Sequence, residues 1–282
     1  MARPLTEDWR DWLRLNRDRG CDRAVLFRRA EDEGFDPVAI AMELGRMDLV
    51  AQPQPAAAAQ PPLGASASQD FWAAMTSPPL TDPAHRPRAW RLDTELAQVY
   101  EIPDLLSSRE CAAVIRAIDA ALVPSTVTHG PSDYRTSRTC HLHAADAVLA
   151  SELDQRFARL MGVSPALSEP IQGQRYDVGQ YFKAHTDWFA PGTAEYEEHA
   201  SLGGQRTWTL MVYLNAVASG GETVFQRVGR RFTPIAGLGL AWNNLHASGE
   251  PNHDTLHEAM PILEGRKYVI TKWFRAEPGR CG

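Results

Sequence analysis

Short stretches with the composition and spacing of β-strands dominate the second half of the chain. Seven of them follow Ser168: Ile171–Tyr176, Thr207–Leu214, Thr223–Phe225, Arg231–Pro234, Leu238–Trp242, Glu258–Ile262 and Lys267–Phe274. A strand at Ala97–Ile102 and two amphipathic helices precede them, the first begun by a Ser107–Glu110 capping box and the second ending at Gly162. Between the helices, Val123–Cys140 is predicted to be a loop. Helices followed by many short strands favour an α+β domain whose strands close into a sandwich or barrel.

The first third of the chain has a different character. Residues 6–46 read as three short helices, with Thr6, Asp22 and Asp36 as caps. They contain no group of residues that would bind a metal or act as a nucleophile, so we expect a small module that stabilises the protein. The alternative is a module that recruits a protein substrate. Proline and alanine then dominate from Ala51 to about Arg88, which predicts a linker in which only Phe71–Met75 could dock on a neighbouring surface. The predicted organisation is a helical module at 1–48, a linker at 49–88 and a catalytic domain at 89–282.

Charge and composition narrow the classes of partner. A formal net charge of -6 gives no general reason to expect nucleic acid or an anionic membrane as a partner. No apolar run approaches the ~20 residues of a membrane-spanning helix, and the charged N-terminus lacks the apolar core of a secretory signal. The four cysteines are scattered and form no CxxC pair. We therefore expect a cytoplasmic protein with reduced thiols.

The sequence RYDVGQYFKAHTDW contains His185 and Asp187 two positions apart. On an extended chain both side chains point to one face and supply two ligands of a 2-His-1-carboxylate triad, which holds Fe(II) and leaves positions open. His257 is the candidate third ligand. Four other histidines compete for this role: His141 and His143, which alternate, and His246 and His253, which lie in a loop-like stretch.

Lys267 lies ten residues after His257 and begins an alternating run. Period two places Lys267, Val269, Thr271 and Trp273 on one face. A cation that points into a barrel is costly unless it meets an anion, and a dicarboxylate co-substrate would supply one. Two histidines and a carboxylate could also hold zinc, but a simple hydrolase has no use for this lysine.

Several spaced motifs together resemble the prolyl 4-hydroxylase branch of the 2-oxoglutarate- and Fe(II)-dependent dioxygenases. They are Tyr176 with Gly179–Gln180, Arg206–Leu214, Gly220–Phe225, His257 with Pro261, and Lys267 with Lys272–Trp273, within about Leu96–Ala276. The resemblance implies a double-stranded β-helix (jelly roll) with helices packed outside. It implies His185, Asp187 and His257 as iron ligands, and Lys267, Tyr176 and Thr223 as the groups that bind 2-oxoglutarate. L-ascorbate is implied as reductant and O2 as second co-substrate.

The implied reaction is hydroxylation of a proline, coupled to conversion of 2-oxoglutarate to succinate and CO2. Asp187 favours hydroxylation, because related halogenases have a small residue at this position. Arg135 and Ser137 match a mobile loop that closes over a peptide, and Arg206 and Trp273 match residues that line the entrance, so a peptidyl substrate is favoured. A free amino acid or small metabolite is the alternative substrate. A non-catalytic binding protein, with the N-terminal helices as its functional part, is the alternative from another class.

Overall fold

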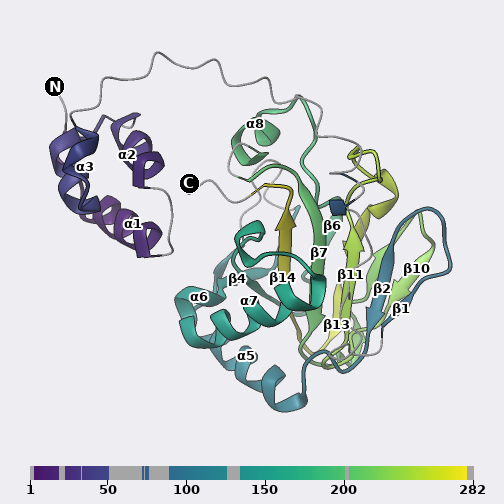
Figure 1. Ribbon diagram of the computed structural model, residues 1–282. Helices are drawn as coiled ribbons and strands as arrows, with labels where there is room; N and C mark the ends of the chain where they lie inside the picture. Colours follow the sequence, from purple (N-terminus) through teal and green to yellow (C-terminus); the bar gives the residue numbers. More distant parts are fainter. Residues whose placement is uncertain are drawn as a thin grey trace. The chain divides into compact units, whose positions relative to one another are not determined.

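The computed structural model describes residues 3–18, 23–32, 34–50, 72, 74–75, 89–125, 134–200 and 203–277. The chain divides into two compact units between Ala67 and Ser68. The first is purple in Figure 1, and the second runs from blue to yellow. Most of the predicted linker lies outside the described residues. None of the described helices has the length and apolar character that a membrane-spanning segment requires.

Apolar residues at helical spacing build the N-terminal unit. Its elements are α1 (Glu7–Asp18), α2 (Arg23–Asp32), α3 (Pro37–Leu44) and the 3-10 turn η1 (Met47–Leu49). Thr6 accepts a hydrogen bond from the Trp9 amide, and Asp36 caps α3, as predicted. The buried core includes Leu13, Leu26, Phe27, Ile40 and Leu44. The predicted cap Asp22 lies outside the described residues.

The second unit is built mainly from two antiparallel sheets. The larger has the strand order β1-β2-β11-β7-β14-β5-β4-β3, the smaller β10-β9-β12-β6, and β13 pairs with β8. The strands are β1 (Trp90–Arg91), β2 (Val99–Ile102), β3 (Val123–Pro124), β4 (Arg138–His141), β5 (Gln172–Tyr176), β6 (Phe182–His185), β7 (Arg206–Tyr213), β8 (Ser219–Gly220), β9 (Thr223–Phe225), β10 (Arg230–Phe232), β11 (Gly239–Asn243), β12 (His257–Ala259), β13 (Ile262–Glu264) and β14 (Lys267–Arg275). The helical segments are α5 (Ser108–Ala120), α6 (Leu142–Ala145), α7 (Ala147–Met161), η2 (Pro165–Leu167), α8 (Ala194–Ala200) and η3 (His253–Thr255).

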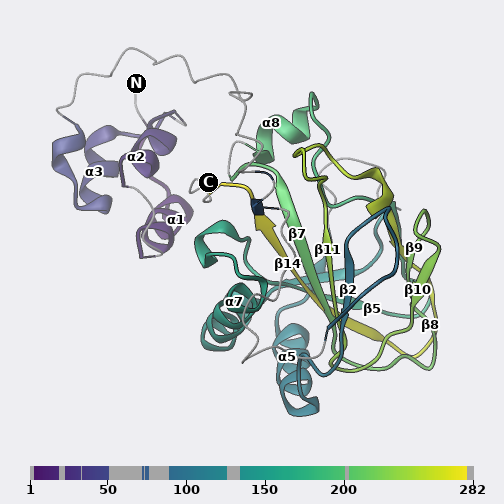
Figure 2. The same ribbon diagram turned by 45° about the vertical axis from the view of Figure 1, so that its right-hand side comes forward.

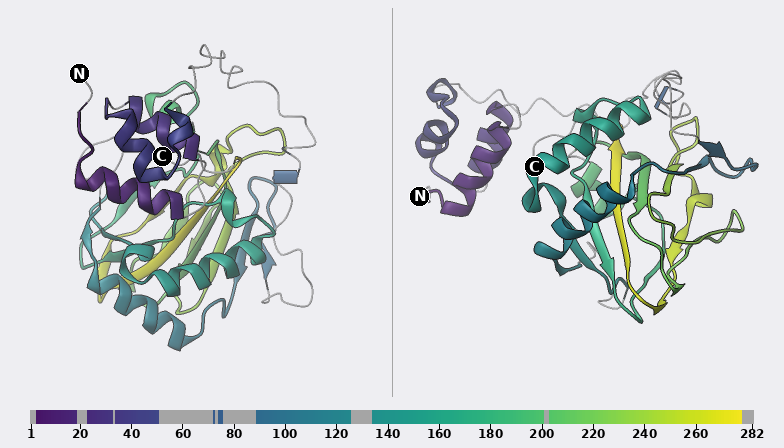
Figure 3. Two further views of the ribbon diagram at one scale, coloured as in Figure 1. Left: turned by 60° about the vertical axis from the view of Figure 1, so that its left-hand side comes forward. Right: turned by 90° about the horizontal axis from the view of Figure 1, so that it is seen from below.

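The two faces of the large sheet are covered differently. Helices α5 and α7 lie against one face, where Val114, Ile118 and Phe157 pack with alternate strand residues such as Val212 and Ile270 (Figures 2 and 3). The opposite face meets the small sheet in a second apolar cluster. Because strand side chains alternate, each central strand contributes to both clusters. The space between the sheets holds the candidate site.

The structure confirms most of the predicted elements and corrects some. All seven predicted stretches contain strands, and the Ser107–Glu110 capping box and the Gly162 helix end are present. The predicted loop 123–140 is wrong at its ends, because β3 and β4 form there and extend the large sheet beyond β5. The stretch Glu258–Ile262 is divided between β12 and β13. Period-two alternation in β14 is confirmed, since Lys267, Val269, Thr271 and Trp273 all line one cavity.

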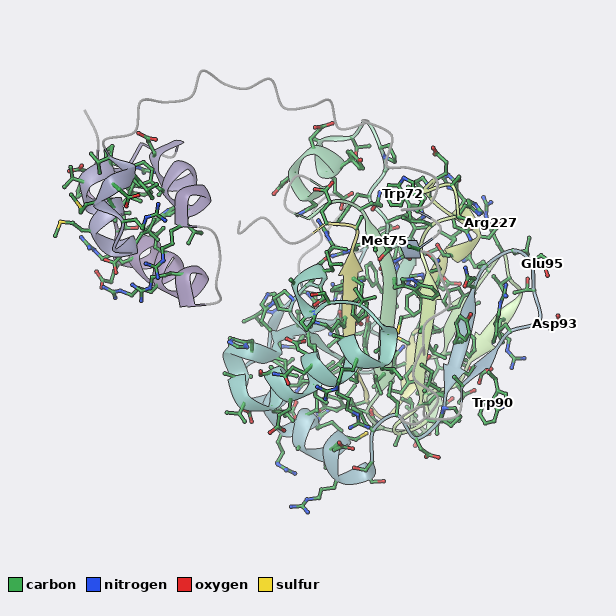
Figure 4. All side chains as sticks on the ribbon, viewed as in Figure 1. Trp72, Met75, Trp90, Asp93, Glu95 and Arg227 are labelled. Carbon is green, nitrogen blue, oxygen red and sulfur yellow. The ribbon has the colours of Figure 1, made fainter. Side chains whose placement is uncertain are left out.

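The predicted docking of the Phe71–Met75 segment is confirmed at Trp72 and Met75. The buried Trp208 indole donates to the Met75 carbonyl at 2.9 Å. The Trp72 ring lies so close to Gly249 that a Cβ there would approach it to 2.5 Å. Trp72 and Met75 are labelled in Figure 4. This short segment therefore belongs to the second unit and contacts the connection between β11 and β12.

Candidate active site

Two neighbouring strands of the small sheet bring His185 and His257 together. His185 ends β6, His257 begins β12, and the antiparallel register pairs them directly, with ring centroids 4.3 Å apart. Asp187 lies in the bend after β6, so it reaches the shared space through the turn and not by strand alternation. One ligand atom from each of the three residues lies within 4.8 Å of the others. The structure thus assembles the three residues predicted as metal ligands.

Backbone carbonyls orient both imidazole rings. Nδ1 of His185 lies 2.8 Å from the Lys183 carbonyl oxygen, and Nδ1 of His257 lies 2.9 Å from that of Thr255. A proton on each Nδ1 satisfies these contacts and leaves the Nε2 lone pair free to bind a metal. Burial and the neighbouring His257 lower the pKa of His185 to about 3, which keeps this imidazole in its neutral, metal-binding form.

The Asp187 carboxylate is held from the large sheet. Thr209 on β7 donates to Asp187 Oδ2 at 2.7 Å, and the Asn244 side chain donates to the Thr209 hydroxyl at 3.0 Å. Asp187 Oδ1 lies 3.9 Å from His185 Nε2. Although burial opposes it, the neighbouring histidines and Arg206 lower the pKa of Asp187. One carboxylate oxygen is therefore occupied by Thr209, and the other faces the space between the histidines.

Aromatic rings enclose the two histidines. Phe182 stacks on His185 with ring centroids 3.6 Å apart. Phe225 stacks on His257 at 5.2 Å, and Trp242 meets the same ring edge-on at 4.9 Å. This packing fixes the imidazole planes and limits water on the sides that do not face the shared space.

Lys267 lies in the same cavity as the triad and is 1% exposed. Its Nζ donates to the Gly221 carbonyl at 2.8 Å and lies 5.1 Å and 5.5 Å from the ring centroids of Tyr176 and Tyr213. Among the described residues no carboxylate forms an ion pair with it. Burial lowers the pKa of Lys267 to about 7, which Glu222 only partly opposes. The donor set therefore fits an anionic ligand that would complete this site.

Tyr176 and Thr223, both predicted to bind the co-substrate, lie in this cavity too and are 2% exposed. Tyr176 pairs with Lys267 across β5 and β14. The Tyr213 hydroxyl donates to Thr223 Oγ1 at 2.6 Å, which leaves the Thr223 proton available to a ligand. The lysine end of the cavity thus gathers one cation and three hydroxyl groups.

Arg135 lines the cavity, and the buried Ser137 bonds it without lining the cavity itself. Arg135 is half-buried: its guanidinium contacts Ser137 at 3.0 Å, Thr139 at 3.3 Å and Gln172 at 3.1 Å, and lies over the Phe182 ring. Ser137 is buried and shares a 2.9 Å hydrogen bond with Ser125. Arg135 lines both the lysine cavity and a wider neighbouring cleft.

Arg206 and Trp273 lie together between the triad and the outside. The Arg206 guanidinium lies 4.1 Å from the Trp273 ring centroid and donates to the Asp187 carbonyl at 3.3 Å. Its other edge is bound by Glu169 through contacts of 2.6 and 2.7 Å, and Glu169 also accepts from Arg275 at 2.9 Å. A planar two-point ion pair of this kind holds Arg206 rigidly at the mouth of the site.

A cleft of about 620 Å3 leads from the triad toward the edge of the large sheet. It is lined by Arg135, Arg206 and Trp273, by residues after β6 such as Trp188 and Phe189, and by Val123 and Pro124 of the edge strand β3. The narrower lysine cavity opens beside it, and both cavities include His185 and Asp187. The predicted metal ligands thus lie where a small pocket meets a wider cleft.

The competing histidines do not form a second centre among the described residues, where the only candidate metal group combines His185, Asp187 and His257. His141 ends β4 and is exposed, and His143 is half-buried in α6. His246 is exposed in the connection after β11, and His253 packs edge-on against Trp188 at 4.7 Å.

The fold and the site together define a class. Two histidines and one carboxylate on adjoining segments of a β-sandwich, with open space on one side, form a facial triad of the kind that holds non-haem iron. A buried lysine in the same cavity supplies a counter-charge for an anionic co-substrate.

Comparisons with known proteins agree with this class. Residues 171–275 match the family model of the 2OG-Fe(II) oxygenase superfamily. The chain is 32% identical to prolyl 4-hydroxylase subunit alpha-1 of Rattus norvegicus over 184 residues, which cover 62% of this chain and 34% of that protein. It is 35% identical to subunit alpha-3 of Bos taurus over 178 residues, 60% of this chain and 32% of that protein. Residues 171–275 are therefore similar to 2OG-Fe(II) oxygenases, and the wider region is similar to prolyl 4-hydroxylases; the chain spans about a third of the length of these relatives.

Solved structures give similar matches. A viral collagen prolyl hydroxylase from Paramecium Bursaria Chlorella virus-1, in complex with 2OG, shares 25% sequence identity, with a TM-score of 0.48 over 63% of this chain and 95% of that chain. A Pseudomonas putida prolyl-4-hydroxylase shares 20% identity, with a TM-score of 0.43 over 72% of this chain and 98% of that chain.

Sequence reasoning missed several residues of the site. Thr209 and Tyr213 lie within the predicted strand 207–214, and period two places both on the face of Met211. That signal could have marked them as inward-facing. Glu169, which lies before the first predicted strand, carries no such periodic signal, because its partners Arg206 and Arg275 come from two distant strands.

Proposed function

We propose that this protein is an Fe(II)- and 2-oxoglutarate-dependent dioxygenase that hydroxylates a proline of a peptide or protein. The observation that carries the proposal is the occurrence, in one cavity, of the His185–Asp187–His257 group and a buried lysine without a carboxylate partner among the described residues. The two facing sheets would then be a double-stranded β-helix domain at 89–282, preceded by a helical module at 1–48 and a linker.

The metal fits the donor set of the triad. Both Nε2 atoms and one Asp187 oxygen face the shared space, while the remaining polar atoms of these side chains are bound by Lys183, Thr255 and Thr209. Bound Fe(II) would supply the activation of O2 that C–H hydroxylation requires, with L-ascorbate as the reductant that keeps the metal ferrous. The protein would contribute ligand orientation and exclusion of water.

Lys267, Tyr176 and Thr223 would bind the distal carboxylate of 2-oxoglutarate. The carboxylate would satisfy the Lys267 charge, and the two hydroxyl groups would complete its hydrogen bonds. Oxidative decarboxylation of the co-substrate would consume O2 and yield succinate and CO2, with one oxygen atom entering succinate and the other the hydroxylated substrate.

The open cleft favours a peptidyl substrate over a free amino acid. A small metabolite calls for an enclosed pocket, whereas the cleft of about 620 Å3 extends to the edge strand β3. Arg206 and Trp273 at its mouth, together with Arg135 along its wall and Ser137 bonded to Arg135, would position the peptide. The cytoplasmic location stays a prediction; the described cysteines, Cys111 and Cys140, are free thiols.

Succinate release tests the proposal. Purified protein with Fe(II), ascorbate and 2-oxoglutarate should release succinate in proportion to proline-containing peptide, with a mass increase of ~16 Da on a prolyl residue. His185→Ala and Asp187→Ala should abolish both signals, and exposed His246→Ala serves as the matched histidine control. Full activity in either triad variant would refute the assignment. Turnover with free proline but with no peptide would favour the small-molecule alternative.

A further inference from the structure

A row of polar side chains connects the lysine cavity with the wider cleft. Gln172, Gln174 and Tyr176 alternate along β5, so all three project from the same face of the large sheet. Gln174 and Tyr176 are buried, at 6% and 2% exposure. Buried amide groups destabilise a fold unless their polar atoms have partners, so the partners of this row are informative.

The hydrogen bonds run without a break from Tyr176 to Arg135. The Tyr176 hydroxyl donates to Gln174 Oε1 at 3.4 Å, and Gln174 Nε2 donates to Gln172 Oε1 at 3.1 Å. Arg135 Nη2 donates to the same Gln172 oxygen, also at 3.1 Å. Thr271 on β14 steadies the middle of the row by accepting from Gln174 Nε2 at 3.3 Å.

Arg135 is half-buried and is held by neutral groups. Its hydrogen-bond partners Ser137, Thr139 and Gln172 are neutral, and no described carboxylate forms an ion pair with it. Without a carboxylate to fix it, the position of the guanidinium depends on these weaker acceptors. Arg135 lines the same cavity as Tyr176; burial raises the pKa of the Tyr176 hydroxyl, and the nearby Arg135 and Ser137 oppose that rise.

The backbone around Arg135 leads directly to the metal-binding strand. The Lys183 amide donates to the Tyr134 carbonyl at 3.0 Å, and the Thr136 amide donates to the Tyr181 carbonyl at 3.1 Å. Residues 134–136 therefore pair with the start of β6, which ends at His185. The backbone on both sides of Arg135 is thus bonded to the strand that carries His185.

We propose that Gln172, held by Gln174, is a positioning residue: it holds the Arg135 guanidinium so that a carboxylate bound at Tyr176 can fix Arg135 and the backbone of residues 134–137. The inference rests on the proposed function for the identity of that carboxylate, the distal group of 2-oxoglutarate. Tyrosine has one hydroxyl proton, and an ionised carboxylate is a stronger acceptor than the Gln174 amide oxygen. Once this proton turns to the carboxylate, the bond from Tyr176 to Gln174 is lost, and the Tyr176 oxygen becomes more negative toward Arg135, which lines the same cavity. Gln174 keeps its bond to Gln172, which holds the acceptor for Arg135 in place.

Hydrogen exchange of the amides of residues 134–137 tests this inference without a peptide substrate. The full chain is loaded with Mn(II), so that no turnover occurs, and exchange is compared with and without 2-oxoglutarate. In the wild type we expect 2-oxoglutarate to slow exchange about tenfold. Gln172→Leu removes the acceptor shared by Arg135 and Gln174, so the slowing should fall below about threefold while calorimetric affinity for 2-oxoglutarate changes by less than about threefold.

A conservative variant and a matched control separate positioning from a general structural role. Gln172→Glu keeps an acceptor and adds a charge opposite Arg135, so exchange should be slow even without 2-oxoglutarate. Gln226→Leu removes an exposed glutamine that bonds Glu258 instead, and should behave as the wild type. Full protection in Gln172→Leu with 2-oxoglutarate bound would overturn the inference alone. Absence of 2-oxoglutarate binding to the wild type would overturn the proposed function, and the inference with it.

Discussion

Strand β14 carries two buried lysines that have opposite surroundings. Lys272 faces the helices, where its Nζ contacts Asp154 at 2.7 Å and the Glu169 carbonyl at 2.8 Å. Lys267, five residues earlier, faces the small sheet and bonds the Gly221 carbonyl. Both side chains are 1% exposed, yet among the described residues Lys272 has a carboxylate and Lys267 has none.

The difference separates a structural charge from a functional one. On the helix-covered face the fold supplies its own anion, so the Lys272 pair is complete in the ligand-free protein. On the inner face, burying the Lys267 cation without a counter-ion lowers the stability of the fold. A ligand that brings the anion would explain why the lysine is there. The same contrast holds for arginines, since Arg275 and Arg206 share Glu169 while Arg135 has neutral partners.

The largest expected effect is that of Lys267→Ala on 2-oxoglutarate. Losing one partner of a buried charge pair costs roughly 3–5 kcal/mol, so the affinity should fall at least about hundredfold while the metal affinity stays nearly intact. The stability of the ligand-free protein should be unchanged or higher, because an unneutralised buried charge is removed. Calorimetric titration and thermal unfolding measure the two quantities. A loss of affinity within about threefold would remove Lys267 from the co-substrate site.

Thr209→Val comes next and tests whether inner-face hydroxyls support the metal site. The variant keeps the shape but removes the donor to Asp187, and loss of such a supporting hydrogen bond lowers metal affinity roughly 10–100-fold. Thr207→Val on the same strand is the matched control, because the Thr207 hydroxyl donates to the Phe274 carbonyl and touches no ligand. Titration with Mn(II) or Fe(II) against a competing chelator measures the metal affinity of each variant. Equal affinities in the two variants would show that the Thr209 contact does not matter to the metal.

The two lysines also show which features of the site can be predicted from the sequence. Alternation along β14 was sufficient to place Lys267 inward with Val269 and Thr271, because the period of a strand is a local property. The pairing of His185 with His257 was accessible only through the resemblance to a known family. Their strands lie far apart in the chain, and spacing alone does not say which strands become neighbours.

The partners of the charged groups could not be predicted at all. Asp154 lies on a helix and Lys272 on the last strand, so their contact depends on how α7 crosses the sheet. Arg135 lies in a stretch that was predicted to be a loop, but β3 and β4 flank it and turn its side chain into the site. Such contacts follow from the packing of whole layers, which no local pattern encodes.

A smaller effect is expected from Lys272→Met, which tests the structural half of the comparison. The variant leaves the Asp154 carboxylate without its partner, and since Asp154 is 28% exposed, water compensates in part. We expect a loss of about 1–3 kcal/mol in the free energy of unfolding, with 2-oxoglutarate affinity unchanged. Denaturant unfolding and calorimetry check the two quantities. The double variant with Asp154→Asn should recover part of the loss, and a fall in 2-oxoglutarate affinity would contradict the separation of the two faces.

The last and smallest effect concerns pH. Burial lowers the pKa of Lys267 to about 7 in the ligand-free protein, whereas an unfolded lysine keeps its ordinary, higher pKa. Between these values the folded state binds fewer protons than the unfolded state, so the stability contribution of Lys267 rises with pH through this window and is lost as the pH falls through about 7. The affinity for 2-oxoglutarate has the opposite pH dependence and falls as the pH rises, because the carboxylate needs the charged lysine. Its affinity should be constant well below pH 7 and should fall above it, approaching about tenfold per pH unit, or about 1.4 kcal/mol.

Lys267→Arg provides the control for this pH dependence. The guanidinium stays charged, so the variant should bind 2-oxoglutarate less tightly than the wild type near neutral pH but with a much flatter profile above it. Calorimetric titrations of the Mn(II)-loaded proteins across this range compare the two slopes. If wild type and Lys267→Arg lost affinity in parallel, the titrating group would lie elsewhere in the site. If 2-oxoglutarate affinity fell steeply with pH in the wild type but not in Lys267→Arg, Lys267 would be the cation that the co-substrate neutralises.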